Sequence, residues 1–329
     1  MITTRHASAA VALVPLLVAC GPKEAAKTDS VKTDTAAAAA APAAGAPNAA
    51  TFAKTATVGG FRTPESVKYD ADQDVYFVSN INGNPSQKDG NGFISRMRPG
   101  DNTVDSLHFV AGGRGGATLN APKGMAIVGD TLYVADIDAV RLFDRHTGKA
   151  LGSVDLSKMK AHFLNDVVAG PDGAVYITDT GVQFDAKGNT SHPGPDQVFK
   201  ITGRTASVAV SDSSLAGPNG ITWDKANGRF VIVPFAGTSI VTWKPGDAKP
   251  APLAAHLAGQ MDGVELLGDG RLLVTSWADS SVSSVAKDGT TTKVVTGVPS
   301  PADIGVDGKR NRLLVPIFTG DRVEVYQIK

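Results

Sequence analysis

A six-residue stretch, Asn219-Gly220-Ile221-Thr222-Trp223-Asp224, recurs in altered form five more times along the chain. The third and fifth positions of every copy are apolar, although one copy has only an alanine at the fifth. Alternation of this kind predicts a β-strand with one buried face. The six copies begin, in chain order, at Glu65, Lys123, Asn165, Asn219, Asp262 and Ala302.

A turn and a second apolar run follow each copy; the turns include Pro171-Asp172-Gly173 and Gly268-Asp269-Gly270. Neighbouring copies start 40 to 58 residues apart, and no convincing helix interrupts them. A period of that length with several strands per repeat is typical of a β-propeller. The sequence therefore predicts an all-β, six-bladed β-propeller over residues 51–329. The second runs, each expected to be the next strand of its blade, are residues 75–78, 132–135, 175–178, 230–233, 272–275 and 313–315.

The last copy is followed by too little chain for a complete blade. Only about three strands fit after Ala302, whereas a propeller blade has four. We expect residues 55–59 to supply the missing outer strand, because a closed ring leaves no open sheet edge.

Composition excludes several classes of protein. The 329 residues carry 32 basic and 32 acidic side chains, and this neutrality argues against a nucleic-acid partner. A single cysteine excludes a disulfide framework and any multi-cysteine metal site. The glycine-rich run at residues 112–116 lacks the Lys-Ser/Thr ending of a phosphate loop, and no Gly-x-Ser-x-Gly motif is present to indicate a serine esterase.

The N-terminal residues predict export and lipidation. Residues 7–19 are apolar, too few to span a bilayer but suited to the core of a signal peptide. They end in Leu17-Val18-Ala19-Cys20-Gly21, which resembles a bacterial lipobox. We predict a signal peptide over 1–19, cleaved before Cys20, with lipid on that cysteine; an ordinary secretory signal is the alternative. The expected location is a bacterial membrane: the outer membrane, facing the periplasm, or the cell surface.

The alanine- and proline-rich residues 20–50 are predicted to be a disordered, flexible linker. Such a linker would let the propeller stand away from the bilayer, and we expect the propeller to be a monomer.

The first strand of a propeller blade lines the central channel, so the first residues of the six copies should meet at one rim. Four of them carry the carboxylate or amide oxygens that a hard cation such as calcium prefers. No histidine or cysteine is among them, which disfavours zinc or copper. A hydrogen-bonded polar plug is the alternative, because Asn and Asp also favour turns. These four residues are Glu65, Asn165, Asn219 and Asp262.

The ordered set resembles the gluconolactonase/senescence-marker-protein/luciferin-regenerating-enzyme superfamily; paraoxonases and diisopropyl fluorophosphatase are similar. The resemblance covers most of residues 60–329. It implies a calcium-dependent hydrolase of a small-molecule lactone or related ester. It also implies that Glu65, Asn165, Asn219 and Asp262 bind the ion and that Asp262 is the base or nucleophile. The motifs that carry it are Pro64-Glu65-Ser66, Leu164-Asn165-Asp166-Val167, Pro218-Asn219-Gly220-Ile221 and Met261-Asp262-Gly263-Val264.

Lys123 departs from this pattern because it places an ammonium group on the same rim. It could hydrogen-bond Asp166 or Asp303, point away, bind an anionic substrate, or replace the metal in an inactive site. We expect Lys123, Asn80 and Asp303 to contact substrate, and His192 to be a candidate proton shuttle.

Two long segments, residues 79–92 and 179–197, follow second strands and are expected on the face of the rim. They predict a lid or specificity wall, with tolerated surface insertions as the alternative. Trp277 and Phe235 also follow second strands. Their side chains could either pack within the blades or reach the pocket.

Two other functions compete with hydrolysis. One is a surface-anchored, non-catalytic propeller that binds a peptide or glycan, which Lys123 would favour. The other is a condensing propeller similar to strictosidine synthase, which should lack much of the acidic set.

Overall fold

Six four-stranded antiparallel sheets form residues 51–329, the part of the chain that the computed structural model describes. The predicted signal peptide, Cys20 and the linker lie outside the described residues. Blades 1 to 3 contain β2 (Pro64–Asp70), β3 (Val75–Asn80), β4 (Phe93–Arg98), β5 (Thr103–Ala111); β6 (Pro122–Val128), β7 (Thr131–Asp136), β8 (Ala139–Asp144), β9 (Ala150–Asp155); and β10 (Leu164–Ala169), β11 (Val175–Asp179), β14 (Gln197–Thr202), β15 (Thr205–Ser211). Blades 4 to 6 contain β16 (Pro218–Asp224), β17 (Arg229–Pro234), β18 (Ser239–Trp243), β19 (Ala251–His256); β20 (Met261–Leu266), β21 (Leu272–Ser276), β22 (Ser281–Val285), β23 (Thr291–Thr296); and β24 (Gly305–Asp307), β25 (Arg312–Ile317), β26 (Arg322–Ile328), β1 (Phe52–Gly59).

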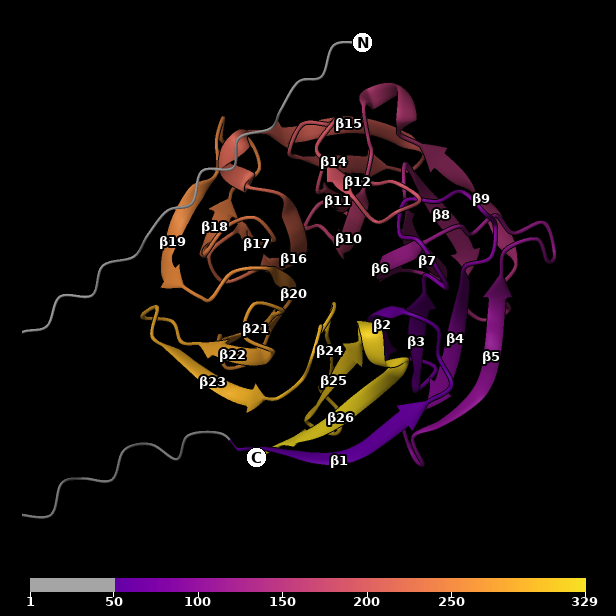
Figure 1. The fold of residues 1–329 in the computed structure, drawn as a ribbon. Coiled ribbons are helices and arrows are strands. Elements are labelled where there is room, and N and C mark those ends of the chain that lie inside the picture. The colour runs from indigo at the N-terminus through magenta and orange to yellow at the C-terminus, as the bar shows by residue number, and fades with distance from the viewer. Residues whose placement is uncertain (1–50) are drawn as a thin grey trace, which may run out of the picture. The chain divides into compact units, whose positions relative to one another are not determined.

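The blades are arranged around a centre to which their first strands are nearest (Figure 1). The predicted all-β, six-bladed propeller is therefore confirmed, and every second apolar run lies in the second strand of its blade. A small hairpin, β12 (Gln183–Phe184) with β13 (Thr190–Ser191), interrupts blade 3. The helical elements among the described residues are three short 3₁₀ turns, η1 (Ser157–Met159), η2 (Ser213–Leu215) and η3 (Phe318–Gly320). Within residues 51–329 no helix has the length and apolar character needed to cross a membrane.

The hydrophobic core is divided among the blades. Six clusters of buried side chains each lie between two adjacent blades, so every sheet is covered on both faces. Between blades 3 and 4, Phe230 packs against Tyr176 at 4.4 Å and against Trp243 at 5.8 Å between ring centroids. Buried aromatic pairs of this kind stabilise packing beyond the area that they remove from water.

The ring is closed by its two ends, as predicted. β1 pairs with β26 in an antiparallel register from Phe52 with Ile328 to Gly59 with Arg322. Thr51 and Lys329 also exchange backbone hydrogen bonds of 3.1 and 3.0 Å. β1 therefore completes blade 6 as its outer strand, and the blade has no long unpaired edge.

Glycines in the second position of the repeat let neighbouring inner strands approach closely. At Gly263 a Cβ atom would lie 2.5 Å from Ile304 N and 2.7 Å from Asp303 Cα, both on the backbone leading into blade 6. The same position is Gly124 in blade 2 and Gly220 in blade 4, with similar clashes.

We expect Gly263→Ala to lower the free energy of unfolding by about 1–3 kcal/mol, because the backbone of the next blade must move. Urea denaturation measures this. Gly268→Ala is the matched control, since a Cβ there meets no atom within 4 Å. Equal stability of the two variants would contradict the role assigned to Gly263.

Candidate metal centre

The rim residues lie at a β-bulge that recurs in the first strands of the blades. In blades 1 to 5 the pairing of first and second strands shifts register across the rim residue and its successor, as between Pro64 and Val67 or Met261 and Val264. A β-bulge redirects the side chain beside it. This shared bulge is the local reason that the rim positions of blades 1 to 5 are equivalent; in blade 6, β24 begins only at Gly305, after Ala302.

The four predicted ligands are buried, each with 4 % of its surface exposed. Within the described residues, Glu65 Oε2, Asn219 Oδ1 and Asp262 Oδ1 have no hydrogen-bond partner. Asn165 donates through Nδ2 to Thr180 Oγ1 over 3.0 Å, so its amide orientation is set by the protein. Buried polar atoms normally have partners, and unpaired ones call for an explanation such as an ion.

Burial and neighbouring charges both act on the two rim carboxylates. Burial raises the pKa of Glu65 well above its usual range, and the Asp262 and Asp303 carboxylates raise it further, against an opposing effect of Lys123. Burial also raises the pKa of Asp262, with Asp303 adding to the rise and the Trp277 indole opposing it. Unpaired oxygens and neighbouring carboxylates fit the requirements of a divalent cation.

No group of three or more His, Cys, Asp or Glu side chains that could hold a metal occurs in residues 51–329. The candidate centre differs from such a group because two of its four side chains are amides. Its oxygen-only donor set suits calcium better than it suits zinc or copper.

Asn80 lies one strand away from the rim, at the end of β3, paired with Pro64. Its Oδ1 accepts the Arg62 N–H at 2.9 Å, and its Nδ2 donates to Val78 O and Ser95 Oγ. Both amide atoms are thus occupied by the protein, which gives Asn80 a structural role where we expected contact with substrate.

The equivalent residues of blades 2 and 3 show the same role. Asp136 accepts the backbone N–H groups of Asn120 and Ala121, and Asp179 accepts that of Phe163. A polar residue that ends the second strand therefore fixes the loop entering its blade. This shared repeat position was the signal in the sequence that could have identified the role of Asn80.

Asp303 lies beside blade 1. Its Oδ2 accepts the Ser66 hydroxyl at 2.6 Å, and its backbone N–H donates to Glu65 O at 2.9 Å. It is buried and acts on Glu65 and Asp262 through its charge.

Lys123 has none of the carboxylate partners that we considered. Its ammonium donates to Pro85 O and Ala121 O, both at 3.2 Å, and lies 4.1 Å from the centroid of the Phe163 ring. Burial lowers its pKa to about 8, although Glu65 and two aspartates oppose the shift. The hydrogen bond to Pro85 attaches the 79–92 loop to blade 2.

The two long loops contact each other. Asn84 Nδ2 donates to Asp185 O at 2.9 Å, and Ser86 Oγ accepts the Phe184 N–H at 3.0 Å. Together with Lys123 and Phe163, these contacts join the loops into one cover beside blades 2 and 3. This arrangement fits the predicted specificity wall.

His192 lies in the second of these loops, where its side chain is half exposed. Its Nε2 lies 2.9 Å from Asp196 Oδ1 and 3.2 Å from Thr180 O. Thr180 also contacts Asn165, so His192 is linked to the rim through one intervening residue.

A second set of charges in the inner strands was missed from the sequence. Lys68 Nζ forms a 3.0 Å ion pair with Glu265. Lys68 lies three residues after Glu65, and Glu265 lies three residues after Asp262. Burial lowers the Lys68 pKa, but Glu265, Asp303 and Asp166 outweigh this and raise it overall. Burial raises the pKa of Asp166 to about 7. Because Lys68 and Glu265 follow the rim residues of their blades by the same three positions, the repeat could have indicated this ion pair.

We expect Lys123→Met to loosen the 79–92 loop, because the loop loses its hydrogen bond to a buried ammonium. Hydrogen bonds to charged groups contribute about 1.5–3 kcal/mol, so amide exchange around Ser86 should rise roughly tenfold to a hundredfold. Hydrogen–deuterium exchange with mass spectrometry measures it. Lys88→Met is the control, since Lys88 forms a half-exposed ion pair with Asp138 that should contribute little. Unchanged exchange in Lys123→Met would contradict this attachment.

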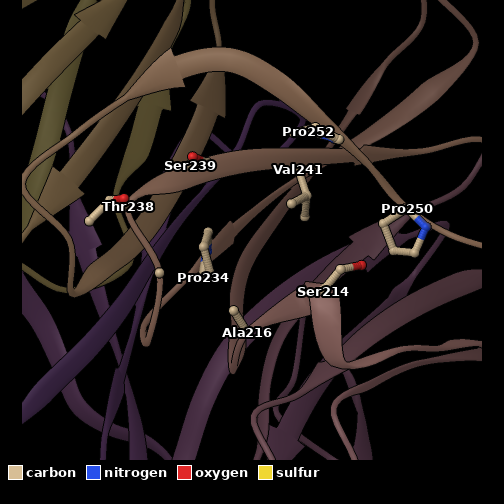
Figure 2. A pocket seen from close by; sticks show the side chains of 9 residues that line it. Ser214, Ala216, Pro234, Thr238, Ser239, Val241, Pro250 and Pro252 are labelled. Carbon is tan, nitrogen blue, oxygen red and sulfur yellow. The ribbon is translucent and has the colours of Figure 1, made fainter.

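A hollow of about 300 Å³ opens elsewhere, against blade 4 (Figure 2). Pro234, Val241, Pro250 and Pro252 contribute its apolar walls, and hydroxyls of serine and threonine its polar atoms. None of its lining residues within the described chain is charged, so it offers no group for metal binding or acid–base chemistry.

A six-bladed propeller with oxygen ligands at one end of its inner strands defines a class of proteins with a candidate metal site in the channel. The model of one family, the SMP-30/gluconolactonase/LRE-like region, matches residues 63–315. The chain belongs to this family, as its resemblance implied. A comparison with curated protein sequences found no significant match.

Solved structures share the fold at low sequence identity. A luciferin-regenerating enzyme aligns with a TM-score of 0.64 at 12% identity, covering 85% of this chain and 95% of that one. A gluconolactonase from Xanthomonas campestris gives 0.63 at 15% identity, covering 86% and 96%. Regucalcin from Agrobacterium tumefaciens, described as a calcium-binding protein, gives 0.60 at 16% identity, covering 85% and 96%.

A different chemistry uses the same architecture. Virginiamycin B lyase from Staphylococcus aureus aligns with a TM-score of 0.56 at 11% identity, covering 85% of this chain and 99% of that one. The fold therefore does not select the reaction, which must be argued from the site.

Proposed function

We propose that this chain is a calcium-dependent hydrolase of lactones or related esters. The observation that supports it most is the set of unpaired, buried oxygens of Glu65, Asn219 and Asp262 at one end of the channel. Membership of a family that includes gluconolactonases gives the reaction class.

The four side chains Glu65, Asn165, Asn219 and Asp262 would hold the ion. When bound, a divalent cation supplies positive charge that polarises a carbonyl oxygen and stabilises an oxyanion. Asp262 accepts the proton of the attacking water, or attacks the carbonyl carbon itself. Thr180 holds the Asn165 amide in one orientation, so that its oxygen stays available. The cover formed by the two long loops limits the access of bulk water from one side.

A lactone panel assayed with and without chelator tests the proposal. We expect EDTA to lower the hydrolysis rate about a hundredfold or more, because a metal contributes several kcal/mol to transition-state stabilisation. Added calcium should restore the rate, and EDTA saturated with calcium beforehand is the control. Hydrolysis that persists in EDTA would contradict metal dependence. Absence of turnover together with absence of bound metal would favour the non-catalytic binding propeller.

The proposed enzyme is tethered to a bacterial membrane through lipid on Cys20. This part of the proposal rests on the sequence of residues 7–20 alone.

A further inference from the structure

A second ring of side chains lies next to the rim. In five blades the residue after the second strand donates its backbone N–H to the carbonyl two residues before the rim position, over 2.8 to 3.1 Å. In blade 2 the corresponding residue is Ile137, whose carbonyl accepts the Leu164 N–H at 2.7 Å. We call these six residues the collar: Ile81, Ile137, Thr180, Phe235, Trp277 and Phe318.

The repeated hydrogen bond places the collar next to the residues that precede the rim. The collar therefore lies between the rim and the loops of the same face. In blade 2, Lys123 Nζ donates to Ala121 O, the carbonyl that corresponds to the acceptor in the other blades. A molecule whose reacting carbonyl reaches the rim from this face must therefore pass the collar.

The collar is apolar and largely continuous. Phe235 and Trp277 make an edge-to-face contact at 5.9 Å, and Trp277 and Phe318 lie 5.2 Å apart. Phe318 in turn packs against a small cluster that contains Ile81 and Ile137. The aromatic part belongs to blades 4, 5 and 6, opposite the blades that carry Lys123 and the loop cover.

Polar partners in the collar are few. The Thr180 hydroxyl is occupied, since it accepts from Asn165 and donates to Pro218 O. Trp277 Nε1 has no partner at normal hydrogen-bond geometry in the described part of the chain, although the indole is near enough to Asp262 to lower the pKa of that carboxyl. A polyhydroxylated ligand loses its hydrogen bonds to water on entering such a ring and recovers few of them.

Phe235, Trp277 and Phe318 are partly exposed, whereas the four rim ligands beneath them are almost fully buried. Adjoining aromatic surfaces left accessible beside a polar centre are characteristic of a binding site with an apolar wall.

From this arrangement we propose that the chain acts on lactones or esters that carry an apolar alkyl or aryl group. The rim ligands take the ester carbonyl, and the Phe235–Trp277–Phe318 wall takes the apolar group. This assignment of substrate class rests on the proposed hydrolase function and excludes sugar lactones as preferred substrates.

The full chain, loaded with calcium, is assayed on δ-valerolactones bearing ethyl, butyl or hexyl groups and on glucono-δ-lactone. We expect kcat/KM to rise about threefold to fourfold per added methylene, the factor for burying one methylene group, and to be lowest for glucono-δ-lactone. Phe235→Ala should flatten this dependence. Phe109→Ala removes a half-buried phenylalanine from the outer strand of blade 1 and should leave the dependence unchanged.

A flat series, or a preference for glucono-δ-lactone, overturns the assignment and leaves the proposed hydrolase intact. If no lactone is hydrolysed, the hydrolase proposal fails, and the corresponding stable lactams decide the matter by calorimetry. Tighter binding of the hexyl lactam than of gluconolactam, weakened by Phe235→Ala and not by Phe109→Ala, supports an apolar site. Equal binding overturns it.

Discussion

Replacing Asp262 with asparagine is expected to reduce kcat for lactone hydrolysis by about a thousandfold. The substitution keeps the shape of the side chain and one ligating oxygen but removes the negative charge and the base. General-base catalysis contributes about 10²- to 10⁴-fold, and the expected loss lies within this range. Because Asp262 Oδ1 has no hydrogen-bond partner among the residues that the structure describes, the fold should survive.

The measurement is kcat at saturating calcium, with Tm recorded for the same samples. Asp288→Asn is the matched control, because Asp288 caps a turn of the same blade through the Thr290 N–H. Its activity should equal that of the unmodified protein. An Asp262→Asn enzyme that keeps a tenth or more of its activity would remove Asp262 from the reaction.

Calcium is expected to raise the Tm of the chain by about 5 °C at pH 8 and by clearly less at pH 5. An ion at a hundred times its Kd stabilises the folded state by about 2.7 kcal/mol. In a domain of this size 1 kcal/mol corresponds to about 2 °C or slightly more. Differential scanning calorimetry with and without calcium measures the shift at each pH.

The pH dependence follows from the raised pKa values of Glu65 and Asp262 in the ion-free protein. Burial, then repulsion among the carboxylates, raises them above the unfolded values of 4.5 and 3.8. The folded state therefore binds more protons, and these groups stabilise it below about pH 4 but lose that contribution as pH rises through their folded pKa values. Calcium competes with the protons, so its effect grows with pH.

Glu65→Gln should weaken both the calcium shift and its pH dependence, because one of the two rim charges is gone. A calcium shift of equal size at pH 5 and pH 8 would contradict binding at these carboxylates, and so would an unaltered shift in Glu65→Gln.

The repeat made the fold and the rim predictable. A strand pattern recurring six times places its first residues at equivalent positions, and the short last copy requires an outer strand from the other end of the chain. The confirmed pairing of β1 with β26 follows from that requirement alone. Residues equivalent by repetition can thus be grouped before any coordinates are known.

The partners of Lys123 could not be predicted in this way. Its two acceptor carbonyls belong to Pro85 in an irregular loop and to Ala121, where blade 2 departs from the other blades. Loop conformation depends on contacts such as that between Asn84 and Asp185, distant in sequence and outside the repeat. The repeat could have predicted two other features, because their positions recur from blade to blade. These are the pairing of Lys68 with Glu265 and the hydrogen bonds of Asn80.

The joining of β1 to β26 also has a consequence for how the protein is made. Among the strands of the propeller, β1 is synthesised first and its partner β26 last. Until then the nascent propeller has two unpaired sheet edges, which could pair with the strands of other chains. The ring can therefore close only after the last strand of the propeller has been synthesised, however early its first strand is available.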